Sequence, residues 1–168
     1  KRFTIVAFDF LSHCDFNVNR LDVLVNWRTN ASFYKDLCNL AERFPEVDII
    51  IRGKGSDWTK IPYFKEVLNK VNRIPNIWID DNYSELNRQY KLASSSDLVI
   101  AKITSIGDEI IAAGKRVIYY DYTPNSSHYF ASEYFNYNNC NIFAYSYIQL
   151  EQMVQTVLNG GELLTEAD

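Results

Sequence analysis

The stretch that decides the fold covers residues 97–120 and reads DLVIAKITSIGDEIIAAGKRVIYY. Apolar runs at residues 97–101 and 116–120 have the length and composition of buried strands. Between them, residues 106–113 have the apolar spacing of a helix, and Gly114 follows in the position where glycine commonly ends a helix. The stretch therefore predicts a strand, a crossover helix and a second strand parallel to the first.

The same alternation continues on both sides of this unit. Further buried strands are predicted at residues 3–8, 47–51, 76–79 and 141–144. Further helices are predicted at residues 31–44, from Pro62 to Val71, after Ser84 and at residues 150–158. Six apolar strands separated by helix-length connections predict the α/β class, with a doubly wound, Rossmann-like parallel sheet of about six strands.

Two serines are expected to act as N-caps of predicted helices. Ser32 precedes the first helix, and Ser84 precedes a helix that we expect to turn Leu86, Tyr90 and Leu92 toward the core.

Length and charge limit the function classes. The chain has 168 residues, which corresponds to one domain, and its 47% hydrophobic content excludes disorder. A net charge of −4 argues against a nucleic-acid partner. The three scattered cysteines indicate reduced thiols, as in the cytoplasm. The chain begins Lys1-Arg2-Phe3 without Met, signal peptide or anchor, which leads us to expect a piece of a longer protein.

Ligands of doubly wound sheets bind where the strands end, so the polar residues at the predicted strand exits are the candidate site residues. These residues are Ser12 and His13, Arg52 and Lys54, Asp80 and Asp81, and Thr104 and Ser105. Lys54 lies between two glycines and is expected either to meet a phosphate or to belong to a solvated turn. Asp80 and Asp81 are expected to read a base edge or hold a metal, although no third ligand lies nearby in the sequence.

The pair Thr104 and Ser105 opens a predicted helix, where backbone N–H groups and hydroxyls together suit a phosphate or diphosphate. Gly107 in the first turn would let a ligand approach the backbone. Glu109 lies on the same side of the helix as Ser105 and suits ribose or sugar hydroxyls. The alternative is that Ser105 only caps its own helix.

The remaining signals are weaker. Gly53-Lys54-Gly55 has neither P-loop nor dinucleotide-motif spacing, and the chain contains no DxD triplet. The histidines, His13 and His128, suit a base or a phosphate ligand, or else a packing or surface position. The aromatic stretch at residues 128–147 is expected to cover the edge of the sheet, with ligand stacking or the docking of a partner as alternatives.

Residues 93–121 resemble the donor-binding segment of GT-B glycosyltransferases, in particular the surface-polysaccharide and teichoic-acid branch that includes polyglycerophosphate transferases. The shared pattern is a small residue and Asp before an apolar strand, then Ser or Thr, a helix with Glu, and Gly-Lys-x-Val before the next strand. The resemblance implies the C-terminal, donor-binding domain of such an enzyme. Here Arg116 replaces the frequent Pro before Val117, and Asp108 is expected to point away from a diphosphate.

Carried over by position, the resemblance implies that Thr104 and Ser105 contact the donor phosphates and that Glu109 binds the ribose or the transferred group. It places Lys54 near the diphosphate, with Arg52 a further candidate to stabilise the leaving group. It places residues 79–81, including Asp80 and Asp81, beside the nucleobase. It implies chemistry without a metal or other cofactor.

The function expected from these residues is donor binding in a glycosyltransferase that transfers a sugar or polyol phosphate from a nucleotide sugar or CDP-polyol to a surface polysaccharide. The partner is the protein's own N-terminal domain, which would supply the base and the acceptor site, so this domain alone should be inactive. The expected location is the cytoplasm, with peripheral attachment at the inner face of the membrane through the missing part. The alternatives are a sugar-nucleotide 2-epimerase of the same fold and a non-enzymatic interaction module.

Overall fold

The computed structural model describes residues 1–9, 27–102, 104–120 and 142–163. Six parallel strands form one sheet in the order β3-β2-β1-β4-β5-β6. The strands are β1 (Phe3–Phe8), β2 (Val47–Arg52), β3 (Ile77–Ile79), β4 (Leu98–Ala101), β5 (Val117–Tyr120) and β6 (Phe143–Ala144). The predicted α/β class and the six-stranded parallel sheet are therefore confirmed, with strand ends that differ by one or two residues.

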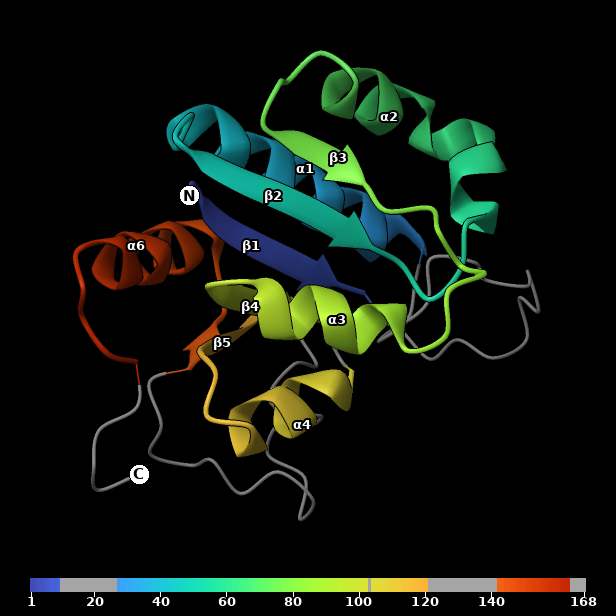
Figure 1. Cartoon of the computed structure of the whole chain (residues 1–168). Coiled ribbons are helices and arrows are strands. Elements are labelled where there is room, and N and C mark those ends of the chain that lie inside the picture. The colour runs from blue at the N-terminus through green and yellow to red at the C-terminus, as the bar shows by residue number, and fades with distance from the viewer. Residues whose placement is uncertain (10–26, 103, 121–141, 164–168) are drawn as a thin grey trace.

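Helices cover both faces of the sheet, as Figure 1 shows: α1 and α2 lie on one face, and α3 and α4 on the other. An Arg43–Glu151 ion pair at 3.0 Å joins α1 to α6. The helices are α1 (Trp27–Arg43), α2 (Lys65–Val71), α3 (Arg88–Ser95), α4 (Ile106–Ala112) and α6 (Tyr147–Leu158). Two 3₁₀ turns, η2 (Asp57–Lys60) and η3 (Pro62–Phe64), lead from β2 into α2.

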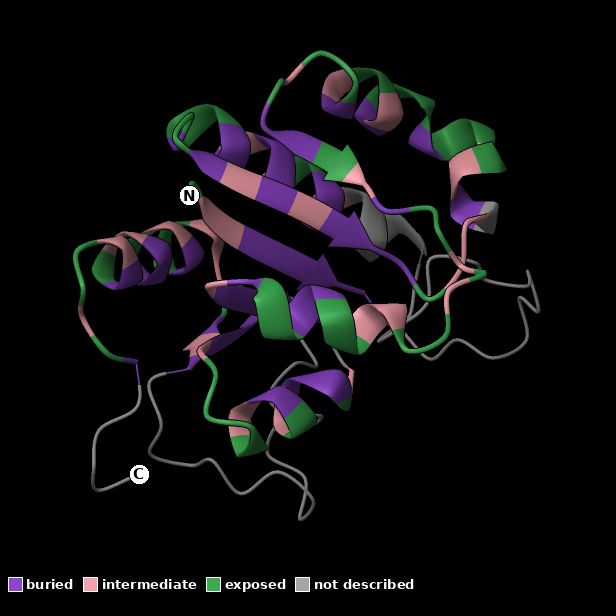
Figure 2. Cartoon of the chain, in the orientation of Figure 1, coloured by how far each residue is buried: buried purple, intermediate pink, exposed green. Residues whose placement is uncertain are grey.

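The central strands form the core. In β1, Ile5, Val6 and Ala7 are fully buried, and β4 and β5 are buried along their whole length (Figure 2). Continuous burial explains why these strands read as unbroken apolar runs in the sequence. Strand β1 pairs with β2 on one side and with β4 on the other. The strand order therefore reverses between β1 and β4, and such a reversal opens a crevice at the carboxyl ends of the two strands.

Two helices, α4 and α6, are followed by glycines whose backbone conformation ends the helix. Gly114 and Gly160, which follow α4 and α6, have φ angles of 73° and 82° that suit glycine. Helix α6 begins at Tyr147 rather than at residue 150, because the Ser146 hydroxyl accepts a hydrogen bond from the Gln149 N–H and caps the helix.

Both predicted serine caps are wrong. Helix α1 already begins at Trp27, so Ser32 lies inside it. The Ser84 hydroxyl donates to Asn82 instead, and α3 begins four residues later, after Asn87 at a φ of 59°.

The later start of α3 changes which of its residues face the core. Leu92 is buried as predicted, but Leu86 is 83% exposed and precedes the helix. Tyr90 is 40% exposed rather than packed in the core. Within the described residues, no helix is long and apolar enough to cross a membrane.

Candidate functional site

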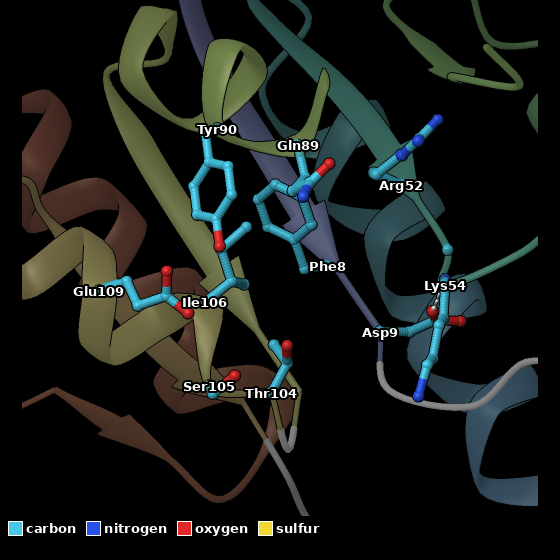
Figure 3. Close-up of a pocket in the computed structure, with 11 residues that line it drawn as sticks. Phe8, Asp9, Arg52, Lys54, Gln89, Tyr90, Thr104, Ser105, Ile106 and Glu109 are labelled. Atoms are coloured by element: carbon cyan, nitrogen blue, oxygen red, sulfur yellow. Dashed lines mark hydrogen bonds between the residues drawn. The ribbon is translucent and has the colours of Figure 1, made fainter. Parts of the chain in front are cut away.

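A cavity of about 370 Å³ lies where β1, β2 and β4 end, at the reversal of strand order (Figure 3). Its volume falls in the range of small-molecule binding sites. The end of β1, the loop after β2, the helix α3 and the start of α4 each contribute to its walls. The lining residues are Phe8, Asp9, Arg52, Gly53, Lys54, Gln89, Tyr90, Thr104, Ser105, Ile106 and Glu109.

Thr104, Ser105 and Glu109, three of the site residues proposed from the sequence, form the wall of the cavity at the start of α4. Ser105 occupies the N-cap position, but its side chain makes no capping hydrogen bond. The alternative that Ser105 only caps its helix is therefore wrong. The hydroxyl and the nearby carboxylate face a cavity that is large enough for a ligand.

Gly107 has a role that the sequence did not suggest. A Cβ at this position would lie 2.6 Å from the Tyr119 hydroxyl oxygen and 2.7 Å from two ring carbons of Tyr119. The glycine therefore makes room for Tyr119 of β5, and Gly107 is not among the lining residues of the cavity. The same Tyr119 hydroxyl donates to Asp108 at 2.5 Å, which agrees with the expectation that Asp108 points away from the site.

Replacing Gly107 with Ala is expected to destabilise the protein by about 1–3 kcal/mol, because the buried Tyr119 ring has to move to admit a methyl group. A urea titration followed by circular dichroism measures the change. Ser94→Ala, at an exposed position of α3, is the control and should reduce the stability by less. Equal stability of Gly107→Ala and the wild type would contradict the tight packing of α4 on β5.

Asp9 is a lining residue that the sequence analysis missed. Its carboxylate accepts a hydrogen bond from the Lys54 backbone N–H at 3.2 Å and another from the Tyr34 hydroxyl. Only 5% of Asp9 is exposed. The carboxylate thus joins the end of β1 to α1 and to the loop that carries Lys54. The available signal was the position of Asp9, the first polar residue after the buried run of β1.

Arg52 lines the cavity, but its guanidinium is directed toward the segment after β3 (Figure 3). One nitrogen, Nη1, lies 2.6 Å from Oδ2 of Asp80 and also donates to the backbone oxygen of Asn82 at 3.1 Å. The guanidinium carbon lies 4.0 Å from the centre of the Tyr83 ring, a cation–π contact. Arg52 therefore ties β2 to the segment before α3.

Asp80 is 7% exposed and is engaged on both of its oxygens. Arg52 occupies Oδ2, and Arg88 occupies Oδ1 at 2.8 Å. Neither Asp80 nor Asp81 is among the residues that line the cavity, and Asp81 is exposed. The structure places the Asp80 side chain among arginines, so its predicted position beside a nucleobase is not supported by a cavity contact.

Tyr83 lies under the Arg52 guanidinium and has an unusual environment. Burial raises the pKa of its hydroxyl to about 12, although the charge of Arg52 acts in the opposite direction. The hydroxyl is buried without a hydrogen-bond partner in the described part of the chain. The phenol therefore stays protonated at neutral pH.

Helix α3 contributes Gln89 and Tyr90 to the cavity, and the sequence analysis assigned neither of them to a site. The Tyr90 hydroxyl points toward the Glu109 carboxylate on α4 (Figure 3). A hydrogen bond with Glu109 raises the pKa of Tyr90, which therefore remains a donor at neutral pH. Tyr90 was missed because its spacing with Leu92 was interpreted as a core pattern.

The structure brings together five of the nine predicted site residues: Arg52, Lys54, Thr104, Ser105 and Glu109. Ser12, His13, His128 and most of the aromatic stretch lie outside the described residues. Among the residues that the structure describes, no three His, Cys, Asp or Glu side chains are grouped so that they could hold a metal ion.

Three solved structures illustrate what this chain resembles, whereas no family model and no curated protein sequence matches it. The UDP-GlcNAc 2-epimerase of Neisseria meningitidis, bound to UDP-GlcNAc, has 12% identity and a TM-score of 0.60, over 94% of this chain and 37% of that one. The S. aureus MnaA–UDP structure has 10% identity and a TM-score of 0.56, over 94% and 37% of the two chains.

The third structure is a UDP-forming α,α-trehalose-phosphate synthase of Burkholderia xenovorans, with 10% identity and a TM-score of 0.55, over 94% and 36% of the two chains. The chain thus spans little more than a third of the length of each of these enzymes. Their likeness shows the fold, and it agrees with the architecture that the sequence predicted. The chain therefore has a Rossmann-like α/β fold, which it shares with the matched third of each of these nucleotide-sugar enzymes.

Proposed function

We propose that the cavity binds a nucleotide-activated donor, a nucleotide sugar or a CDP-polyol, and that the chain is the donor-binding domain of a glycosyltransferase. The observation that carries this proposal is the cavity at the reversal of strand order, where two hydroxyls, a carboxylate and a lysine meet. The chemistry of these groups matches a nucleoside diphosphate, because hydroxyls and an ammonium suit phosphates and a carboxylate suits sugar hydroxyls.

The phosphates would lie between the two walls of the cavity. Thr104 and Ser105 donate hydrogen bonds from the α4 side, and Lys54 supplies positive charge from the β2 side. Asp9 fixes the backbone of Lys54, and its buried negative charge disfavours a phosphate directly beside it. The diphosphate is therefore expected nearer to Thr104 and Ser105 than to Asp9, with Glu109 on the ribose or the transferred group.

The ligands named for the similar structures support this class of donor. One of them is bound to UDP-GlcNAc and another to UDP, and the third is named as UDP-forming. The resemblance of residues 93–121 to the surface-polysaccharide and teichoic-acid branch supports transfer of a sugar or polyol phosphate to a cell-envelope acceptor. No metal is proposed for this site.

Glycosyl transfer breaks the bond between the sugar carbon and the diphosphate oxygen, which keeps the electron pair. The acceptor hydroxyl forms the new bond to that carbon and loses its proton to a base. In this chain, Lys54, Thr104 and Ser105 would stabilise the charge that develops on the diphosphate. We propose that the base and the acceptor site belong to the N-terminal domain of the same protein, in the cytoplasm or at the inner face of the membrane.

A 2-epimerase of the same fold is the second candidate, because one of the similar structures, that of Neisseria meningitidis, carries that name. Incubation of the full-length protein with a nucleotide sugar separates the two functions. A transferase releases free nucleotide in an acceptor-dependent way, whereas an epimerase converts one nucleotide sugar into another.

Titration of the 168-residue chain with UDP, CDP and GDP, by calorimetry or NMR, tests the proposal. We expect one of these nucleotides to bind, and EDTA to leave the binding unchanged. Ser105→Ala and Glu109→Ala are each expected to weaken it about tenfold, the effect of losing one hydrogen bond to a charged group.

Two variants outside the cavity serve as matched controls. Ser94 and Glu46 are exposed and are not among the lining residues, so Ser94→Ala and Glu46→Ala should bind as the wild type does. A wild-type chain that binds none of the three nucleotides would overturn the proposed function. Binding that survives both Ser105→Ala and Glu109→Ala would place the nucleotide elsewhere.

A further inference from the structure

Asp9 is a buried carboxylate in the wall of the cavity. It is the first residue after β1, only 5% of it is exposed, and it lines the cavity at the reversal of strand order. Its two oxygens accept hydrogen bonds from the Lys54 backbone N–H, at 3.2 Å, and from the Tyr34 hydroxyl. Both of these donors are uncharged groups, so the two bonds hold the carboxylate in place without neutralising its charge.

The charged residues of the lining favour a ligand that carries little negative charge. Among the described residues, the charged ones that line the cavity are Asp9, Arg52, Lys54 and Glu109. Two of them are carboxylates, and the Arg52 guanidinium is bound to Asp80, which lies outside the lining. Added negative charge on a ligand is therefore opposed by two carboxylates and favoured chiefly by Lys54.

The two walls of the cavity meet different parts of a bound donor. Thr104 and Ser105 lie on the α4 side, and Asp9 lies across the cavity from them (Figure 3). With the diphosphate on the two hydroxyls, the group beyond the second phosphate is the part of the donor that lies toward Asp9. Salt screens exposed charges only beyond a Debye length of about 8 Å and screens buried charges less, so the charge of Asp9 acts on that group.

We propose that Asp9 is a specificity-determining residue, whose charge makes the site prefer nucleoside diphosphates and their sugar or polyol esters over nucleoside triphosphates. This inference rests on the proposed function, because it requires a nucleotide in the cavity. A third phosphate is negatively charged and only accepts hydrogen bonds, as Asp9 does, so the two groups repel each other. The hydroxyls of a sugar or polyol are uncharged and donate hydrogen bonds, so Asp9 tolerates them in the same place.

The test is a set of calorimetric titrations that compare the diphosphate and the triphosphate of one nucleoside. The diphosphate is whichever of UDP, CDP and GDP binds the wild type, and EDTA is present so that no divalent cation neutralises the phosphates. We expect the wild type to bind the triphosphate about tenfold more weakly than the diphosphate. Asp9→Asn should reduce this preference to about twofold, mainly through tighter binding of the triphosphate. The asparagine has the size of Asp9 and keeps an oxygen that accepts from the Lys54 N–H.

Two control variants separate the charge of Asp9 from its structural role. Glu46→Gln removes an exposed carboxylate outside the cavity lining, so it should keep the tenfold preference. Tyr34→Phe removes a hydrogen bond to Asp9 but leaves its charge, and it should also keep the preference.

The wild type alone can contradict the inference, whether or not any variant folds. Equal affinity of the wild type for the two nucleotides would overturn the role of Asp9 while the proposed function stands. An Asp9→Asn variant that weakens both nucleotides equally, or that leaves their ratio unchanged, would do the same. Absence of nucleotide binding to the wild type would instead overturn the proposed function and this inference with it.

Discussion

Asp80→Ala is expected to destabilise the protein by about 3–5 kcal/mol, the cost of breaking a buried ion pair by removing one partner. The side chains of Arg52 and Asp80 are only 8% and 7% exposed, and their atoms approach to 2.6 Å. Without the carboxylate, the Arg52 guanidinium stays buried with backbone oxygens as its remaining acceptors. Because domains are stable by only about 5–15 kcal/mol, this variant should unfold at a much lower urea concentration.

Two further variants show whether the uncompensated charge causes this loss. Asp81→Ala changes an exposed neighbour and should stay within about 0.5 kcal/mol of the wild type. Arg52→Met combined with Asp80→Ala removes both charges and should be more stable than Asp80→Ala alone. If the double variant is the less stable of the two, packing rather than charge explains the loss.

The same ion pair bears on the binding site. Asp80 is bound to Arg52 at the end of β2 and to Arg88 at the start of α3, the helix that carries Gln89 and Tyr90. The pair therefore sets where α3 lies relative to the cavity. The sequence analysis placed Asp80 beside a ligand and made Arg52 a candidate to stabilise a leaving group. The structure shows that these two side chains also form an ion pair with each other.

The parts of the fold that the sequence predicted are those that depend on local patterns. Strands buried on both faces, such as β4 and β5, are unbroken apolar runs, and Gly114 ends α4 with a positive φ. The predicted caps failed because Ser32 and Ser84 each had a competing local structure, a longer helix and a turn. A single serine before an apolar pattern does not distinguish these cases.

Four residues that the sequence analysis proposed for the site do line the cavity: Thr104, Ser105, Glu109 and Lys54. Their positions follow from the ends of strands and the start of a helix, which the sequence pattern indicates. Asp9 and Tyr90 were missed because their roles depend on partners distant in the sequence. Asp9 accepts hydrogen bonds from the Tyr34 hydroxyl and the Lys54 backbone N–H. The environment of the Tyr90 hydroxyl is set by Glu109 on another helix. No spacing rule within one segment contains such a contact.

Trp58→Ala is the second variant with a large expected effect, again about 3–5 kcal/mol. Trp58 is fully buried, stacks on Tyr34 with 4.2 Å between ring centres, and meets Phe64 edge-on at 5.3 Å. Its removal leaves a cavity among large rings that cannot collapse without moving α1. Urea titrations of the variant and the wild type give the free energies of unfolding, and the difference is this loss of stability.

Trp58→Phe separates the packing of the ring from its polar atom. The indole nitrogen Nε1 is buried with no hydrogen-bond partner among the described residues. A phenylalanine loses part of the ring contact but also removes this unpaired N–H, whose burial is itself unfavourable. Trp58→Phe should therefore cost less than half of what Trp58→Ala costs. Equal losses for the two variants would contradict this account of Nε1.

The variants at Trp58 also probe the binding site, because the stack continues to the cavity. Trp58 packs on Tyr34, the Tyr34 hydroxyl donates to Asp9, and Asp9 accepts from the Lys54 backbone N–H. Under conditions where Trp58→Ala remains folded, Tyr34 loses its stacking partner and the loop of Lys54 becomes less constrained. We expect this variant to bind nucleotide more weakly than the wild type, and Trp58→Phe, which keeps an aromatic ring against Tyr34, to retain most of the affinity. Unchanged affinity in folded Trp58→Ala would show that Lys54 does not depend on this chain of contacts.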